Sequence, residues 1–257
     1  MDIQVGSLCL SYSLLWNPTL LDYLRDTQDY DTTRDLWPVA AKQIVKALAR
    51  VDSGSMFNPD LKPEGWFFFD WRDGLDVNTA MQAAIIFGIQ ETAELAGMLG
   101  KSEEASAWVP VAKKMKDASR KILYDRSKGL FVSGDDRQVS NLSQTWMIKA
   151  GVLDKKKARK AINAALVNEG TVMPGTPCAM HYLVDAMMLA DMPDDARELL
   201  TTYWGGMVDK GADTFWESYD PDDDFISAYS FSPLNSACHA WSCTPVYFIH
   251  KYPEIFI

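Results

Sequence analysis

The strongest constraint on this 257-residue chain is the helical spacing of its apolar residues, which recurs through most of the sequence. The spacing predicts helices over residues 10–25, 34–50, 77–99, 103–123, 138–150, 154–166, 177–190, 194–204 and 238–251. Residues 81–98, 144–150 and 178–189 are apolar, and each is followed by a more charged helix. A helix that is apolar on all sides is buried, whereas one with a charged face meets solvent. The pairs therefore predict an all-α toroid with an inner and an outer layer of helices.

The connections after the outer helices are long and contain unusual residues, at 65–71, 129–133 and 204–233. In a helical toroid such loops gather at one mouth, where a rigid scaffold holds functional side chains. No Gly/Ser linker or block of charge interrupts the helices, so the pattern predicts one domain over residues 1–257. An open solenoid is the weaker alternative, because no tight helical repeat is visible.

Residues at the ends of these helices give local predictions. Pro38 is expected in the first turn of helix 34–50, where proline is tolerated. Asp76 suits the N-terminal cap of helix 77–99, and Gly100 suits its C-terminal cap. Ser102 is expected to cap the helix that follows.

The charge of the chain argues against two classes of partner. Its formal net charge is -10, and the one basic run, at 155–160, is typical of the solvated start of a helix, so no footprint for nucleic acid is present. No apolar segment approaches the ~20 residues of a membrane span. The first residues lack the pattern of a signal peptide. We therefore expect a cytoplasmic protein if Met1 is a genuine start, and a periplasmic or secreted one if the chain is a fragment.

The cysteines are Cys9, Cys178, Cys238 and Cys243, and their spacing matches neither a zinc knuckle nor a disulfide framework. Buried free thiols are the expected state.

Two segments about twenty residues apart could carry chemistry. Residues 211–217 end in Thr214-Phe215-Trp216-Glu217, and residues 235–245 contain Cys238-His239-Ala240-Trp241-Ser242. A carboxylate beside aromatic rings suits sugar cleavage, because rings stack on apolar sugar faces while the carboxylate activates water. Glu217 is thus the candidate general base, although a surface glutamate in an acidic loop fits the local sequence equally well. His239 fits either substrate contact or a core histidine.

A second cluster follows the aromatic run 67–69, which reads as a short strand or a buried lead-in to a turn. Asp70 and Trp71 are its candidate site residues. Trp146, His181 and Tyr182 lie near one end of inner helices, where core packing and ligand contact explain them equally well. Trp204 is expected to pack against the loop that presents Glu217. The acidic loop 220–224 lacks the EF-hand spacing, so a solvated turn is favoured over a Ca²⁺ site.

These motifs resemble the α-L-rhamnosidase family of glycoside hydrolases over nearly the whole chain. The resemblance implies an (α/α)6 barrel and inverting hydrolysis of terminal α-L-rhamnosides without a cofactor or metal. Glu217 would be the general base that activates water. Asp70, Trp71, Trp216, His239 and Trp241 would contact the rhamnoside substrate. The sequence does not indicate an oligomeric state.

One part of the family pattern is absent. Inverting hydrolysis needs a second carboxyl group, and the family's general acid lies in a motif that precedes the region matched here. The segment 31–37 resembles that motif faintly, but it aligns better with an ordinary outer helix. We therefore expect a partial barrel whose acid motif is missing upstream. The alternatives are a non-catalytic carbohydrate-binding protein or pseudoenzyme on the same fold, and another glycosidase or a polysaccharide lyase.

Overall fold

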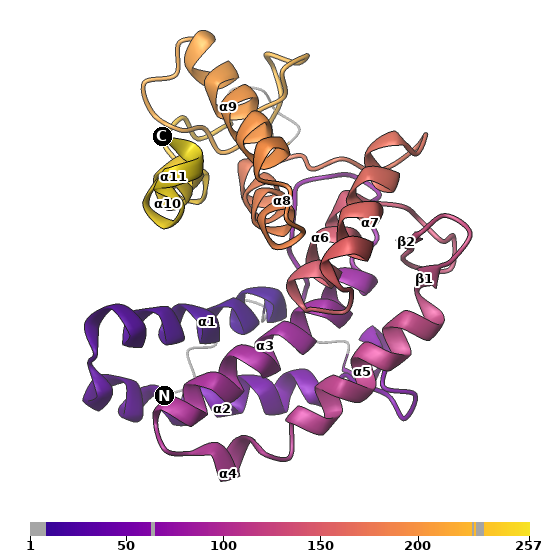
Figure 1. The fold of residues 1–257 in the computed structure, drawn as a ribbon, viewed down its shortest axis with the longest axis vertical. Helices are drawn as coiled ribbons and strands as arrows, with labels where there is room; N and C mark the ends of the chain where they lie inside the picture. Colours follow the sequence, from indigo (N-terminus) through magenta and orange to yellow (C-terminus); the bar gives the residue numbers. More distant parts are fainter. Residues whose placement is uncertain (1–8, 63–64, 228, 230–233) are drawn as a thin grey trace.

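The computed structural model describes residues 9–62, 65–227, 229 and 234–257, and its regular structure is almost entirely helical (Figure 1). The α-helices are α1 (Leu10–Thr27), α2 (Tyr30–Leu48), α3 (Asn78–Met98), α4 (Ser102–Ala105), α5 (Val109–Ile122), α6 (Asn141–Lys149), α7 (Lys155–Val167), α8 (Pro177–Leu189), α9 (Pro193–Asp209), α10 (Thr244–Lys251) and α11 (Pro253–Phe256). The regular structure also includes two 3-10 turns, η1 (Pro59–Leu61) and η2 (Ala240–Ser242). It includes one two-stranded sheet as well, formed by β1 (Tyr124–Asp125) and β2 (Leu130–Phe131).

The helices form two layers, as the alternation of apolar and charged segments predicts. Helix α3 is buried on almost every side, and it packs between α1 and α6, while α6 packs in turn against α8. Helices α5 and α7 bury only one face and turn their lysines outward. Figure 1 shows the helix pairs following an arc from α1 and α2 to α10 and α11. The fold is an all-α toroid of inner and outer helices.

A cavity of about 400 Å³ is lined by residues of α1, α3, α6, α8, η2 and α10, and we call it the axial cavity. Lys149 of α6 pairs with Asp185 of α8 in its wall, and both side chains are about one-tenth exposed. Lys251 of α10 reaches within 3.9 Å of the same carboxylate. The nearly buried pair thus joins α6 to α8, and the more exposed Lys251 adds α10 to the same charge network.

Several local expectations need correction. Helix α2 begins at Tyr30, because Asp29 caps it through the Thr32 N–H, and Pro38 therefore lies inside the helix. The predicted helix 103–123 is two helices, and Ser102 begins the first of them without capping it. The cap residue of α3 is Val77, one position later than predicted, although Asp76 does accept a hydrogen bond from the N–H of Asn78.

The structure decides between the two alternatives for the aromatic run and corrects the last helix. Residues 67–69 form no strand but a buried lead-in, since Phe68 and Phe69 are each 5% exposed. The predicted helix 238–251 is divided into η2 and α10, with His239 capping η2. The strands β1 and β2 were not expected, because each has only two residues and carries no alternating pattern.

The cysteines are free, as expected, but Cys238 and Cys243 are exposed rather than buried, because both lie at the ends of the short turn η2. Cys9 and Cys178 are partly buried. None of the helices in the described ranges is long and apolar enough to cross a membrane. Residues 1–8 lie outside the described part of the chain, and so do residues 230–233 at the end of the connection expected at 204–233.

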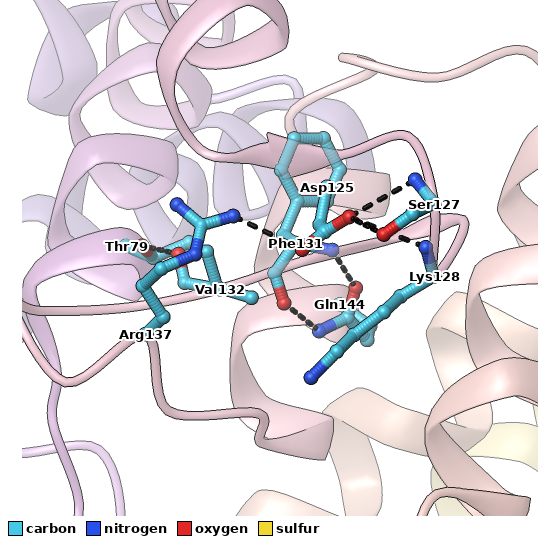
Figure 2. Close-up of polar contacts among 8 residues, drawn as sticks. All are labelled: Thr79, Asp125, Ser127, Lys128, Phe131, Val132, Arg137 and Gln144. Carbon is cyan, nitrogen blue, oxygen red and sulfur yellow. Dashed lines mark hydrogen bonds and ion pairs between the residues drawn. The ribbon is translucent and has the colours of Figure 1, made fainter.

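The short sheet is fastened to the inner layer by buried side chains (Figure 2). Gln144 of α6 accepts from the Phe131 N–H at 2.7 Å and donates to the Phe131 carbonyl at 2.8 Å. Thr79 of α3 donates to the Val132 carbonyl at 2.8 Å. These bonds give partners to backbone N–H and C=O groups of β2 and Val132, on a sheet that has two strands in the described part of the chain.

Replacing Gln144 by Met should therefore lower the free energy of unfolding by at least ~2 kcal/mol. The thioether fills similar space but leaves the buried N–H and C=O of Phe131 without partners, at about 1–3 kcal/mol each. Urea denaturation followed by circular dichroism measures the change. Gln43→Met on the outer helix α2 is the matched control, and equal midpoints for the two variants would contradict the role of Gln144.

Candidate active site

The two loop segments that carry the sequence motifs are joined by backbone hydrogen bonds. The Glu217 N–H donates to the Ser236 carbonyl at 2.8 Å, and the His239 N–H donates to the Phe215 carbonyl at 2.9 Å. The indole N–H of Trp241 donates to the Glu217 carbonyl at 3.0 Å. The backbone of Glu217 is thus fixed on both sides by residues about twenty positions later in the chain.

The carboxylate of Glu217 is 4% exposed and both of its oxygens accept hydrogen bonds. Oε1 accepts from the Tyr229 hydroxyl at 2.8 Å, and Oε2 accepts from the Ser236 N–H at 3.2 Å. The bond to Glu217 is the main reason why the pKa of Tyr229 is raised above its ordinary value. Glu217 is therefore a held, nearly buried carboxylate and not the surface glutamate of the alternative interpretation.

Aromatic rings connect Glu217 to the second sequence cluster. Tyr229 lies against Trp71 with ring centroids 5.8 Å apart, and Trp71 meets Phe68 edge-on at 4.8 Å. Phe68 stacks on Trp241 at 5.8 Å, and the His239 ring stacks on Trp241 at 4.0 Å. The structure therefore brings Glu217, Trp71, Trp241 and His239 together, and His239 is half-buried rather than a core residue.

Asp70 has a supporting position beside Trp71. Its Oδ1 accepts from the Thr176 hydroxyl and its Oδ2 from the Gly175 N–H, both at 2.7 Å. Burial raises the pKa of Asp70, and these two hydrogen bonds partly oppose the increase. A Cβ at Gly175 would lie 2.6 Å from the Trp71 carbonyl oxygen, so glycine is needed for this close approach. Asp70 thus ties the Trp71 segment to the start of α8.

The remaining sequence candidates lie in the protein core or in the axial cavity, which Trp241 of the site also lines. Trp146 is 1% exposed and belongs to the core, which decides its interpretation in favour of packing. His181 and Tyr182 line the axial cavity, where burial lowers the pKa of His181 to about 4. Trp204 donates to the Ser242 carbonyl at 2.8 Å and packs in the cluster that also holds Phe215, as expected.

Trp216 is not in the aromatic chain around Glu217. It lines a different cavity with Ser218, Tyr219 and Asp220. Tyr229 and Phe68, by contrast, belong to the site and were not among the predicted residues. Phe68 stands in the aromatic run that drew attention to Asp70, but Tyr229 carries no sequence signal beyond its place in the same long loop.

No group of three or more His, Cys, Asp or Glu side chains within the described ranges is arranged to hold a metal ion. In the acidic loop, Lys210 pairs with Asp224 and donates to the Pro221 carbonyl at 2.8 Å. The carboxylates of the loop also accept hydrogen bonds from the loop's own N–H groups, from Asp222 to Asp220 and from Phe225 to Asp223.

A buried carboxylate framed by tryptophans at one end of an all-α toroid is the arrangement of a glycosidase-like site. Comparison with known proteins agrees with this class. Residues 12–252 match the bacterial α-L-rhamnosidase six-hairpin glycosidase domain, and the chain belongs to that family. A comparison with curated proteins found no match.

Two solved structures are similar to the chain. The first is a rhamnosidase from Klebsiella oxytoca with rhamnose bound, which is 35% identical, has a TM-score of 0.92 and is matched by 98% of this chain. This chain spans only 48% of that protein. The second is a GH78 family rhamnosidase of Bacillus sp. GL1, at 21% identity and a TM-score of 0.80, with 95% of this chain and 26% of that one covered. The second likeness concerns the fold alone.

Proposed function

We propose that this domain takes part in the inverting hydrolysis of terminal α-L-rhamnosides, with Glu217 as the general base. The observation that supports this most is the placement of Glu217: it is 4% exposed, held by hydrogen bonds at both oxygens, and adjoins a chain of aromatic rings. In this proposal Trp71, Trp241 and His239 contact the sugar, and Asp70 positions Trp71. A rhamnosidase with bound rhamnose among the similar structures supports the choice of sugar.

The general acid is the incomplete part of the proposal. Asp70 is the one other carboxylate beside the aromatic chain that the sequence motifs indicate, and it accepts hydrogen bonds at both oxygens. We assign it to positioning because both of its hydrogen bonds join the Trp71 segment to the start of α8. We propose that the acid comes from a segment outside residues 1–257. The rival interpretation is a carbohydrate-binding protein without catalysis on the same fold.

The 257-residue chain should therefore bind L-rhamnose but hydrolyse an aryl α-L-rhamnoside poorly. Protonation of the leaving oxygen typically contributes ~10²–10⁴-fold to the rate. Calorimetry measures the binding, and release of the aryl group measures the hydrolysis. Rapid turnover by the chain alone would show that one of its own carboxyl groups is the acid. Absence of rhamnose binding would contradict the proposed sugar.

A further inference from the structure

We propose that the cavity lined by Trp216 is a second carbohydrate site, which holds the ring of a neutral sugar apart from Glu217. The cavity measures about 440 Å³, within the range of about 300–1,000 Å³ for small-molecule sites. Its walls come from the start of the acidic loop, from Asn235 and from Lys210 at the end of α9. The proposal does not depend on catalysis at Glu217.

Two residues that line this cavity, Ser218 and Asn235, each carry a buried oxygen without a hydrogen-bond partner in the described part of the chain. Ser218 is 1% exposed, and its hydroxyl has no hydrogen-bond partner within the described residues. Oδ1 of Asn235 is also buried without a partner there, although the amide nitrogen of Asn235 donates to the Ser218 carbonyl at 3.2 Å. Buried polar atoms normally find partners, and one left unpaired costs about 1–3 kcal/mol. Sugar hydroxyls both donate and accept, so they can satisfy both oxygens.

The other walls suit a sugar better than a metal ion. Trp216 is partly exposed and supplies an aromatic surface on which an apolar sugar face can stack, while Tyr219, 6.1 Å away between ring centroids, is 5% exposed and supports it from behind. Asp223 uses Oδ1 for the Phe225 N–H, which leaves Oδ2 as an acceptor for a sugar hydroxyl. Lys210 lies over the Tyr219 ring at 5.5 Å and lines the cavity, so a positive charge already occupies its wall. No group of three or more His, Cys, Asp or Glu side chains is arranged to hold a metal ion anywhere in the part of the chain that the structure describes.

Charge also decides between classes of sugar. Asp220, Asp223 and Asp224 line the cavity against the single cation Lys210. Lys210 is paired with Asp224, and Arg72 approaches Asp220 at 3.9 Å from outside the cavity wall. The remaining negative charge disfavours a uronic acid. The cavity therefore selects a neutral, hydroxyl-rich ring.

Fluorine NMR on protein labelled with 5-fluorotryptophan tests this site separately from the Glu217 site. Trp216→Phe and Trp71→Phe assign the two reporter resonances among the nine tryptophans. Titration with L-rhamnose should shift the Trp216 resonance with its own dissociation constant. Asp223→Asn should weaken that response by ~10-fold, since a charged acceptor is replaced by a neutral amide, and should leave the Trp71 response unchanged. Asp222→Asn, in the same loop but outside the cavity, is the matched control.

Three results would overturn the second site. One is a Trp216 resonance that does not move while Trp71 responds, and another is a common dissociation constant that Asp223→Asn does not alter. The third is a stronger shift of Trp216 with D-galacturonate or CaCl₂ than with L-rhamnose. If Trp216 responds and Trp71 does not, the second site stands and the function proposed for the Glu217 site fails.

Discussion

Replacement of Glu217 by Gln is expected to lower the turnover number on an aryl α-L-rhamnoside by at least ~10²-fold, with little change in rhamnose binding. The amide keeps the shape of the side chain, and its oxygen can still accept a hydrogen bond from the Tyr229 hydroxyl. It cannot take a proton from the attacking water, and general base catalysis is typically worth ~10²–10⁴-fold. Steady-state kinetics on the longest natural polypeptide that contains residues 1–257 measures the effect.

Two variants make this test specific. Glu198→Gln makes the same chemical change on the exposed face of α9 and should leave turnover unchanged. His239→Ala should weaken rhamnose binding as well as turnover, because a residue that contacts the sugar supports ground state and transition state together. Near-normal turnover by Glu217→Gln would place the general base elsewhere, and Asp70 would be the next residue to replace.

The layers of the fold could be predicted because each depends on the composition of one helix. The apolar composition of α3 indicates the inner layer, and the lysines of α7 indicate the outer layer. Asp76, just before α3, accepts a hydrogen bond from the Asn78 N–H in its first turn. The predicted start of α2 is wrong because the prediction places Pro38 in the first turn of the helix, where proline often lies. The cap that begins α2 is Asp29. The helix continues through Pro38 because the aromatic and apolar face of α2 packs against α1 and α3.

The site could be predicted only in part, for a similar reason. Glu217, His239 and Trp241 lie in two short motifs whose residues are joined by backbone hydrogen bonds. Tyr229 reaches Glu217 through the fold of a loop, which no local pattern encodes. Trp216 adjoins Glu217 in sequence but lines another cavity, so neighbours in a motif need not share a site.

The largest effect on stability is expected at the ion pair in the axial cavity. Asp185→Asn should lower the free energy of unfolding by about 3–5 kcal/mol at neutral pH, because it leaves Lys149 charged and nearly buried without its partner. The double variant Asp185→Asn/Lys149→Met removes both charges and should recover much of the loss. Asp31→Asn, which breaks an exposed pair with Arg34, should change stability little. Urea denaturation followed by circular dichroism compares the three variants.

The pH dependence gives the same pair a second, independent signature. Burial acts to raise the pKa of Asp185, but the charge and hydrogen bond of Lys149 and the charge of Lys251 outweigh it and hold the pKa below the ordinary 3.8. A carboxyl group with a depressed pKa stabilises the fold above its unfolded pKa and loses that contribution as the pH falls through the folded one. His181 adds acid sensitivity of the same sign between its ordinary pKa of 6.5 and about 4. The Asp185 charge also raises the pKa of His181, so the two groups are coupled between pH 6.5 and about 4. Below about pH 4 the deficit of Asp185→Asn relative to the natural chain should shrink, because the natural chain then loses the contribution of its own carboxylate. A deficit that does not shrink below about pH 4 would contradict an ionised Asp185 paired with Lys149 in the folded chain.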